Sequence, residues 1–286
     1  MIPERLTSAR VRSWIRPRAT DAHKGSNGHV LVIAGSRGMS GAAALAARGA
    51  LRAGAGLVTV ATTISERPLV ASLVPEAMTV GLSESADGRA AAEASSQVAA
   101  VLSSRHYDVI AIGPGLGVSP DVRKLILGVL GESQRPVLLD ADGLNNLTAV
   151  ELPTQRPLIV TPHPGEFERF FGVKPESRLS AIATTAQQYR LICVLKGAGT
   201  LISDGHLLYQ NPTGNPAMAT GGMGDVLTGV IAGLWAQRLG ALEAATAGVY
   251  LHGLAGDLAA ESDRGLLASD VAATLPKAFR KIGLRP

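Results

Sequence analysis

The string Gly221-Gly222-Met223-Gly224-Asp225 combines residue types that are suited to phosphoryl chemistry. Apolar residues recur at helical spacing directly after it, so we expect a helix to begin at the glycines. Backbone N–H groups and the helix dipole favour anions at such an end, and glycines let a phosphate approach the backbone. We therefore predict that Gly221, Gly222, Met223 and Gly224 form an anion hole and that Asp225 accepts a proton from an attacking hydroxyl. The alternative is a glycine-rich turn in which Asp225 only starts the helix.

A second string, Lys196-Gly197-Ala198-Gly199-Thr200, follows the apolar run at residues 191–195. Exposed amides, a lysine and a threonine hydroxyl together predict contacts with the phosphates and ribose of a nucleotide. The G-x-x-x-x-G-K-[ST] pattern of a P-loop is absent around it. The alternative is a glycine-rich β-turn.

A third string, Thr161-Pro162-His163-Pro164-Gly165-Glu166, lies at the end of a predicted strand. In an open α/β sheet this edge is where ligands bind. The two prolines stiffen the loop and so position His163. We predict that Glu166 holds Mg²⁺ through water, because Mg²⁺ gives up its water ligands reluctantly. The alternative is an acidic residue that complements the dipole at a helix N-terminus.

Two further strings also follow predicted strands. One is the glycine loop at residues 113–117, and the other contains Asp140 and Asp142. Paired aspartates at a strand end are candidates for acid/base groups or for outer partners of a metal, although Asp142 alone can cap the next helix. The first glycine loop, at residues 35–41, lacks the G-x-G-x-x-G spacing of dinucleotide-binding folds, which argues against a Rossmann dehydrogenase.

These strings must be positioned by alternating strands and helices. Apolar runs predict strands at residues 29–34, 57–60, 108–112, 136–140, 158–161 and 191–195, with helices at 41–53 and from a Ser119 cap to about residue 130. Runs that are apolar on both faces are typical of a mostly parallel sheet covered by helices, so we expect a three-layer α/β fold. Asp204-Gly205 predicts a two-residue antiparallel hairpin. Residues 84–105 are predicted as a surface helix and the chain after Asp225 as a run of helices, all within one domain over residues 1–286.

Composition narrows the function classes. Aromatic residues make up 3% of the chain, which argues against nucleic-acid binding because stacking platforms need exposed rings. The formal net charge of +4 is interpreted as solvated helix faces, or as a weak field that attracts an anionic ligand. The single cysteine, Cys193, is expected in a buried strand. No apolar run is long enough to span a membrane, and the N-terminus lacks the apolar core of a signal peptide, so we expect a cytoplasmic location.

Taken together, the strings resemble those of the ADP-dependent NAD(P)H-hydrate dehydratases, a family within the ribokinase-like superfamily. The resemblance runs from about His23 to about Asp257, and its most specific parts are the His163–Glu166 loop, residues 196–200 and residues 215–225. It implies a ribokinase-like three-layer α/β/α sandwich. It also implies a homo-oligomer, up to a tetramer, and a functional link to a separate NAD(P)H-hydrate epimerase.

The resemblance further implies which residues bind which ligand. Ala43, Gly115, Gly117, His163 and Asp225 would contact the substrate, which is NADHX or NADPHX, the hydrated form of NADH or NADPH. The adenine nucleotide would lie against Lys196, Gly197, Ala198, Gly199, Thr200 and Gly224. Bacterial members generally use ADP and eukaryotic members ATP, with Mg²⁺. Related kinases carry Asn-x-x-Glu near the metal where this chain has His163-Pro164-Gly165-Glu166, which weakens the case for Glu166 as a metal ligand.

The chemistry that the resemblance implies is phosphoryl transfer to the hydroxyl of the hydrate, followed by expulsion of phosphate by the ring nitrogen. The net reaction would be NAD(P)HX + ADP giving NAD(P)H + AMP + phosphate. Two alternatives use the same site. One is a kinase of a small hydroxylated vitamin precursor or sugar, and the other is a nucleotide-binding module without turnover, although the Asp and the glycines at residues 221–225 argue against the latter.

Overall fold

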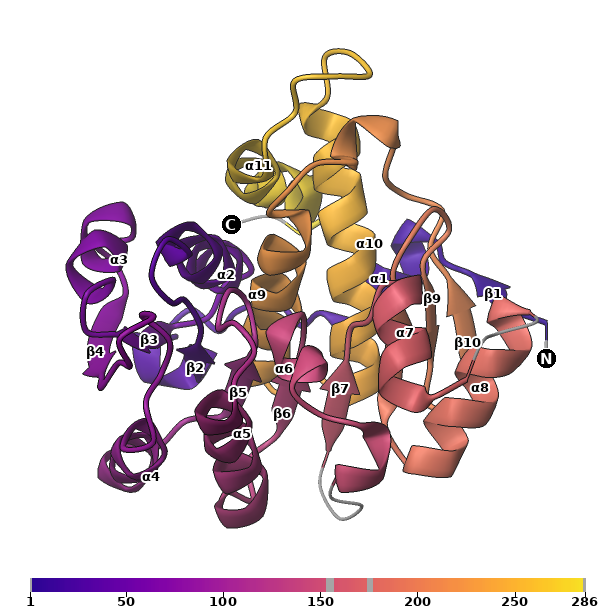
Figure 1. Ribbon diagram of the computed structural model, residues 1–286. Coiled ribbons are helices and arrows are strands. Elements are labelled where there is room, and N and C mark those ends of the chain that lie inside the picture. The colour runs from indigo at the N-terminus through magenta and orange to yellow at the C-terminus, as the bar shows by residue number, and fades with distance from the viewer. Residues whose placement is uncertain (1, 153–156, 174–176, 285–286) are drawn as a thin grey trace.

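The computed structural model describes residues 2–152, 157–173 and 177–284. Its centre is one sheet whose ten described strands lie in the order β1-β10-β9-β8-β7-β6-β5-β2-β3-β4 (Figure 1). The strands are β1 (Glu4–Arg5), β2 (His29–Ile33), β3 (Leu57–Thr63), β4 (Met78–Leu82), β5 (Val109–Ile112), β6 (Val137–Leu139), β7 (Leu158–Val160), β8 (Ile192–Leu195), β9 (Leu201–Ser203) and β10 (Leu208–Gln210).

Every pair of neighbouring strands within β2 to β8 is parallel, and β9 is antiparallel to both β8 and β10. The expected mostly parallel sheet with an antiparallel addition is therefore confirmed. Parallel strands need long crossovers, and the intervening helices supply them. The α-helices are α1 (Ser8–Trp14), α2 (Ser40–Arg52), α3 (Arg67–Leu73), α4 (Ala94–Ser104), α5 (Pro120–Glu132), α6 (Asp142–Asn145), α7 (Pro164–Phe171), α8 (Arg178–Tyr189), α9 (Met223–Ala236), α10 (Ala241–Ala259) and α11 (Ala268–Lys281). Three short 3₁₀ helices are η1 (Lys24–Asn27), η2 (Ala149–Glu151) and η3 (Pro216–Met218).

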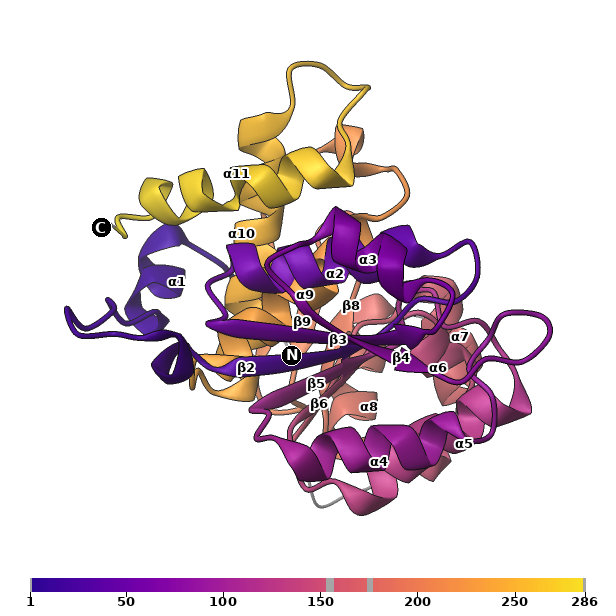
Figure 2. The same cartoon turned by 90° about the vertical axis from the view of Figure 1, so that its left-hand side faces the viewer.

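Helices cover both faces of the sheet, which gives three layers (Figure 2). Alternate residues of β2 belong to different cores: Val30 and Val32 pack with α2, α9, α10 and α11, whereas Leu31 and Ile33 pack with α4, α5, α7 and α8. This explains why the strand sequences are apolar on both faces. Cys193 is a buried free thiol in β8, as expected. No helix in the described ranges combines the length and apolar character that crossing a bilayer requires.

Helix α2 lies unusually close to helix α9, whose N-terminus carries Asp225. A Cβ atom built on Gly229 of α9 would lie 1.9 Å from the carbonyl oxygen of Ala46, and one built on Gly49 of α2 would lie 2.4 Å from the carbonyl oxygen of Val226. Small residues on both helices permit this approach. The alanine-rich α2 therefore packs within the chain and helps to fix α9.

The hairpin between β9 and β10 differs from the expectation. Ser203 pairs with Leu208, so the connection contains the four residues 204–207 rather than two. Asp204 Oδ1 accepts hydrogen bonds from the backbone N–H groups of His206 and Leu207, at 2.8 and 2.7 Å. These side-chain-to-backbone bonds stabilise the wider turn, and the prediction of a two-residue turn was wrong.

Other boundaries also differ from the expectation. The surface helix predicted at residues 84–105 is confined to α4, and the preceding edge strand β4 was not predicted. The two-residue β1 was missed as well, because it is defined only by its pairing with β10. Ser119 does cap α5, accepting a hydrogen bond from the Val122 N–H at 3.2 Å.

Candidate active site at the carboxyl edge of the sheet

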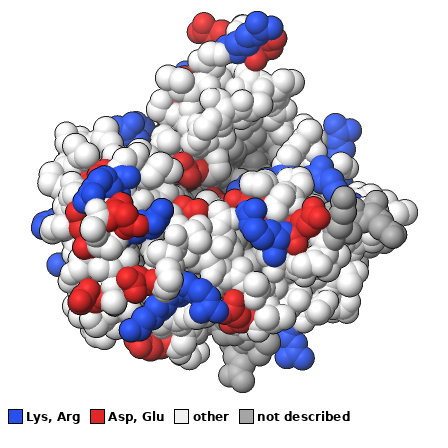
Figure 3. All heavy atoms as spheres, viewed as in Figure 1, with Lys and Arg blue, Asp and Glu red and all other residues white. Residues whose placement is uncertain are grey.

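Three strand ends and one helix N-terminus meet at a single place. Asp140 follows β6, the loop with His163 follows β7, Lys196 follows β8, and Asp225 lies in the first turn of α9. Figure 3 shows that this face is hollowed near its middle and that acidic atoms lie in the hollow. The separate strings of the sequence are thus brought together at the edge where open α/β sheets bind ligands.

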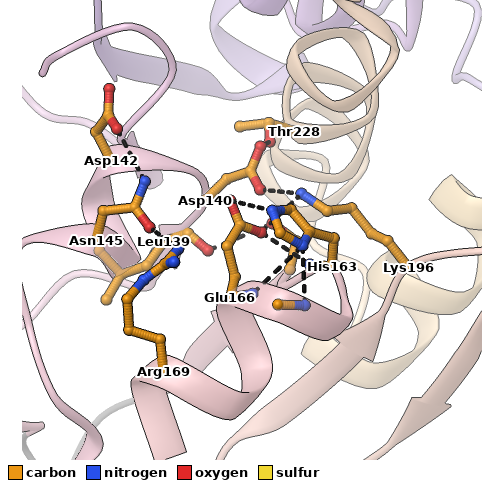
Figure 4. Close-up of polar contacts among 11 residues, drawn as sticks. Leu139, Asp140, Asp142, Asn145, His163, Glu166, Arg169, Lys196 and Thr228 are labelled. Carbon is orange, nitrogen blue, oxygen red and sulfur yellow. Dashed lines mark hydrogen bonds and ion pairs between the residues drawn. The ribbon is translucent and has the colours of Figure 1, made fainter. Parts of the chain in front are cut away.

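A buried charge network connects these elements (Figure 4). Lys196 Nζ lies 2.6 Å from Asp140 Oδ1 and 3.6 Å from Glu166 Oε2. The other oxygen of Asp140 accepts a hydrogen bond of 2.7 Å from the Thr228 hydroxyl of α9. Burial alone would lower the pKa of Lys196, but the two carboxylates outweigh it and raise that pKa. Lys196 is therefore firmly charged, and its ammonium is paired with protein carboxylates as well as bordering the adjacent cavity.

Asp225 differs from the carboxylates around it, because no hydrogen bond joins its side chain to another described residue. Burial raises its pKa to about 7, with further increases from the negative charges of Asp140 and Asp142 and an opposing decrease from Lys196. A carboxyl group that exchanges its proton near neutral pH is suited to general acid/base catalysis. Its position at the helix start agrees with the prediction for Asp225.

The glycines before Asp225 lie at the helix start that was predicted as an anion hole. Gly222 is the residue before α9 and has φ of +85°, a conformation that favours glycine, and a Cβ on it would lie 2.6 Å from Leu45. A Cβ on Gly221 would meet nothing within 4 Å, so this side of the turn is open. A Cβ on Gly224 would lie 3.6 Å from Lys196 Nζ. The free N–H groups of the first helical turn thus lie beside the charge network.

His163 and Glu166 form a capping box at the start of α7. His163 Nδ1 accepts hydrogen bonds from the N–H groups of Gly165 and Glu166, at 3.0 and 3.3 Å, and Glu166 Oε2 accepts the His163 N–H at 2.8 Å. Glu166 Oε1 also lies 3.5 Å from His163 Nε2. Both oxygens of Glu166 are therefore engaged, which favours the alternative of a helix-start carboxylate.

The carboxylates at this edge of the sheet are the candidates for metal ligands. Asp140 and Glu166 are each paired with Lys196, and Asp142 accepts hydrogen bonds from the Gly117 N–H and the Asn145 amide, at 2.8 and 3.0 Å. Across residues 2–152, 157–173 and 177–284, no group of three or more His, Cys, Asp or Glu side chains could hold a metal ion. Asp140, Asp142 and Glu166 are thus each already engaged by a donor of the protein.

A cavity of about 560 Å³ opens beside Lys196 and the start of α9. Its volume is within the range of small-molecule sites. The predicted nucleotide residues Lys196, Gly197, Ala198, Gly199, Thr200 and Gly224 all line it, together with residues of the β10–α9 connection and of α10. Asp257 of α10 fixes that connection by accepting hydrogen bonds of 2.9 Å from the Gly214 N–H and the Asn215 amide.

Sequence reasoning did not find Asn211, Val249, His252 or Asp257. Val249 and His252 line the cavity from the middle of an apolar helix, where no local pattern separates them from core residues. Asn211 forms hydrogen bonds with Thr213 inside the irregular β10–α9 connection. Asp257 contacts the same connection from more than 40 residues away in the sequence. Only the folded arrangement reveals these residues.

The remaining predicted substrate residues lie around the glycine loop after β5. Gly115 has φ of +65°, its carbonyl accepts a 2.8 Å hydrogen bond from Ser36, and a Cβ on it would lie 3.0 Å from Ala42. Ala43 is fully buried and adjoins Gly35, so neither its side chain nor its backbone is exposed to a ligand in this structure. Asp142 is the first residue of α6 and does not cap it, since its carboxylate binds Gly117 instead; the capping alternative for Asp142 was wrong.

Comparisons with known proteins identify relatives of this chain. A family model described as NAD(P)H-hydrate dehydratase matches residues 30–277. The chain is 46% identical over 280 residues to the bifunctional NAD(P)H-hydrate repair enzyme Nnr of Coxiella burnetii, covering 93% of this chain and 54% of that one. It spans about half the length of the first four curated relatives, all of which bear that name.

Solved structures show the same fold. A ribokinase-like superfamily protein of Enterococcus faecalis matches with a TM-score of 0.87 and 30% identity, covering 98% of this chain and 96% of that one. The ADP/ATP-dependent NAD(P)H-hydrate dehydratase of Bacillus subtilis, co-crystallized with ATP/Mg²⁺, matches with a TM-score of 0.85 and 36% identity, covering 96% of this chain and 97% of that one. The predicted ribokinase-like three-layer fold is thereby confirmed.

Proposed function

Since this chain belongs to the NAD(P)H-hydrate dehydratase family, we propose that it converts NADHX and NADPHX back to NADH and NADPH with ADP as phosphoryl donor. One observation carries the proposal: Asp225, with its pKa raised to about 7, lies at an open glycine-lined helix start beside a cavity of nucleotide size. Two relatives support the choice of nucleotide. The Bacillus subtilis protein is named an ADP/ATP-dependent dehydratase, and a relative from Listeria monocytogenes is named an ADP-dependent one.

The proposed reaction has two stages. The hydroxyl oxygen of the hydrate attacks the β-phosphorus of ADP, Asp225 takes the hydroxyl proton, and AMP leaves. The ring nitrogen then expels the phosphate, and loss of a proton from the adjacent ring carbon restores the dihydropyridine. Hydroxide is a poor leaving group and a phosphate ester is a good one, so the nucleotide makes dehydration feasible near neutral pH.

The residues of the site have separate tasks in this scheme. The N–H groups of residues 221–224 stabilise the charge on the transferring group, an effect worth about 3 kcal/mol per donor in known anion holes. Asp140, Lys196 and Thr228 hold the edge of the sheet against α9 through their 2.6 and 2.7 Å contacts. Residues 196–200 and Gly224 bind the nucleotide, whereas Gly115, Gly117 and His163 face the hydrate and the buried Ala43 lies behind the glycine loops.

Magnesium belongs to the proposal as a companion of the nucleotide. Because Asp140, Asp142 and Glu166 are already engaged by donors of the protein, we expect the nucleotide phosphates and water to supply most of the ligands of the ion. Its contribution when bound is to neutralise phosphate charge. A cytoplasmic location, a homo-oligomer up to a tetramer and a link to an epimerase stay predictions, the last supported by the bifunctional repair enzymes among the relatives.

The decisive assay mixes the protein with enzymatically prepared NADHX, Mg²⁺ and either ADP or ATP. We expect NADH absorbance to appear together with equal amounts of AMP and inorganic phosphate when ADP is supplied. A stable phosphorylated product of a small alcohol without NADH formation would instead identify a kinase. Nucleotide binding without any product would identify a non-catalytic module.

A further inference from the structure

Arg178, the first residue of α8, is a charged residue that the mechanism above does not use. Helix α8 packs against β8 and β9, and the Arg178 side chain reaches the loop that joins these two strands. Its Nη1 donates a hydrogen bond to the carbonyl oxygen of Ala198 at 3.1 Å, and its Nη2 donates to those of Leu195 and Lys196 at 3.3 Å each. One side chain thus holds the backbone of the predicted nucleotide loop at three points.

These hydrogen bonds determine which way the peptide groups of the loop face. In a planar trans peptide, the C=O group and the N–H group that follows it point in opposite directions. Because Arg178 binds the carbonyl oxygen that precedes each of Gly197 and Gly199 in the chain, the N–H groups of both glycines point away from Arg178. The carbonyl oxygen of Gly197 itself accepts a hydrogen bond of 2.8 Å from the Thr200 hydroxyl. Side chains therefore set the orientation of every peptide group between residues 196 and 199.

The N–H groups of Gly197 and Gly199 are suited to an anion. No acceptor in the described part of the chain takes a hydrogen bond from either of them, and both residues line the cavity of about 560 Å³. Gly197 is exposed, and the φ values of the two residues, +133° and +63°, lie in the region that favours glycine. Backbone N–H groups that are free in such a turn form a concave site for phosphate. The charged Lys196 borders the same cavity and favours an anion there.

We propose that Arg178 is a positioning residue for the nucleotide, which keeps the N–H groups of Gly197 and Gly199 directed at the phosphates of ADP. This rests on the proposed function in one respect, namely that a nucleotide occupies the cavity. Arg178 is not among the residues that line the cavity, so it acts through the loop and not by contact with the ligand. Its planar guanidinium can bind several carbonyl oxygens at once, which the compact ammonium of a lysine cannot do with the same geometry.

The test measures the affinities of ADP and of adenosine by calorimetry, with Mg²⁺ present, in the wild type, Arg178→Met and Arg190→Met. We expect Arg178→Met to bind ADP about 10- to 100-fold more weakly, the usual loss for a hydrogen bond to a charged group. Its affinity for adenosine should be nearly unchanged, because adenosine has no phosphate. Arg190→Met is the matched control, since it removes an exposed arginine from the other end of the same helix and should leave both affinities unchanged.

A second variant separates the geometry of the guanidinium from its charge, and it also serves if the methionine variant does not fold. Arg178→Lys keeps the positive charge but loses the planar fork, so we expect it to lose most of the ADP affinity that Arg178→Met loses. Full ADP affinity in Arg178→Lys would overturn the proposal, because charge alone would then account for the effect. Equal losses for ADP and adenosine would also overturn it, because the cavity as a whole would have changed.

NMR spectra of protein with isotope-labelled glycine report on the two N–H groups directly. In the wild type, ADP should move the amide resonances of Gly197 and Gly199, whereas adenosine should leave them nearly in place. In Arg178→Lys the shifts caused by saturating ADP should be smaller at both positions. Resonances of Gly197 and Gly199 that do not respond to saturating ADP in the wild type would contradict the proposal.

Turnover distinguishes this inference from the proposed function. We expect Arg178→Met to raise the KM for ADP and to keep kcat close to that of the wild type, because the loop binds the ground state and the transition state alike. If the wild type makes NADH from NADHX with ADP and Arg178→Met has an unchanged KM, the function stands and the role of Arg178 is refuted. If ADP affinity depends on Arg178 but no nucleotide supports NADH formation, the positioning role stands and the proposed reaction is refuted.

Discussion

Asp225 is a half-buried carboxyl group whose pKa is raised by the fold, and this should be measurable in the stability of the protein. Its pKa rises from 3.8 to about 7 in the fold. Between roughly pH 4 and pH 7 the unfolded chain releases this proton while the folded chain keeps it, so the contribution of Asp225 to stability falls as pH rises through that window. We predict that Asp225→Asn is more stable than the wild type at pH 8 and gains little near pH 4, measured by urea unfolding. A difference that is independent of pH would contradict the raised pKa.

Lys196 should matter both for stability and for the titration of Asp225. Lys196→Met removes the partner of two buried carboxylates, Asp140 and Glu166, which typically costs about 3–5 kcal/mol. Because Lys196 lowers the pKa of Asp225, the variant should also shift the acid limb of kcat/KM to higher pH. Thr228→Val is the matched control, since it removes one hydrogen bond from the same Asp140 and should cost about 1–3 kcal/mol. Equal losses in both variants would show that the ion pair is not the main contact.

At the scale of single residues, the sequence located those parts of the site that are written as continuous strings. The glycines before Asp225, the segment from Lys196 to Thr200 and the His163 loop were all found in this way, and the structure brings them together. The burial of the site side chains and their hydrogen-bond or ion-pair partners were not predictable, because both depend on segments that are distant in the sequence. Examples are the pairing of Lys196 with Asp140, 56 residues away, and the burial of His252 in the cavity wall.

At the scale of elements, the contact between α2 and α9 positions the catalytic helix. In Gly229→Ala the new Cβ atom would lie 1.9 Å from the carbonyl oxygen of Ala46, which is far inside van der Waals contact. The helices must separate, and we expect a loss of about 1–3 kcal/mol of unfolding free energy, the usual cost of overpacking, together with reduced turnover. Gly131→Ala, at an exposed position of α5, is the control, because a Cβ there meets nothing within 4 Å and should stabilise by about 0.5–1 kcal/mol. If both variants were equally stable, the helix contact would be looser than described.

Elements with strong local patterns were predictable, and elements defined by pairing were not. Buried strands such as β2 and β5 are short, almost wholly apolar runs between helices. Such runs are typical of strands covered on both faces. The edge strand β4 is only half-buried and contains Gly81, so its pattern is weak. The wide turn at residues 204–207 depends on hydrogen bonds of Asp204, which a dipeptide rule does not include.

At the scale of the whole molecule, the proposed function assigns two binding regions to the two sides of Asp225. The cavity proposed for the nucleotide lies between β8–β10, α9 and α10, and the glycine loop after β5 with the start of α2 lies towards the other end of the sheet. A phosphoryl group moving between two ligands would therefore pass the start of α9. This arrangement accounts for a reaction in which both ligands must be held while one proton is removed.

The most direct test of that arrangement is the turnover of Asp225→Asn with NADHX and ADP, measured beside its affinity for ADP. The account predicts a kcat lowered by about 10²–10⁴-fold, the usual share of general-base catalysis, with ADP affinity and fold retained. Turnover near that of the wild type would contradict it, because the proton would then be leaving by another route.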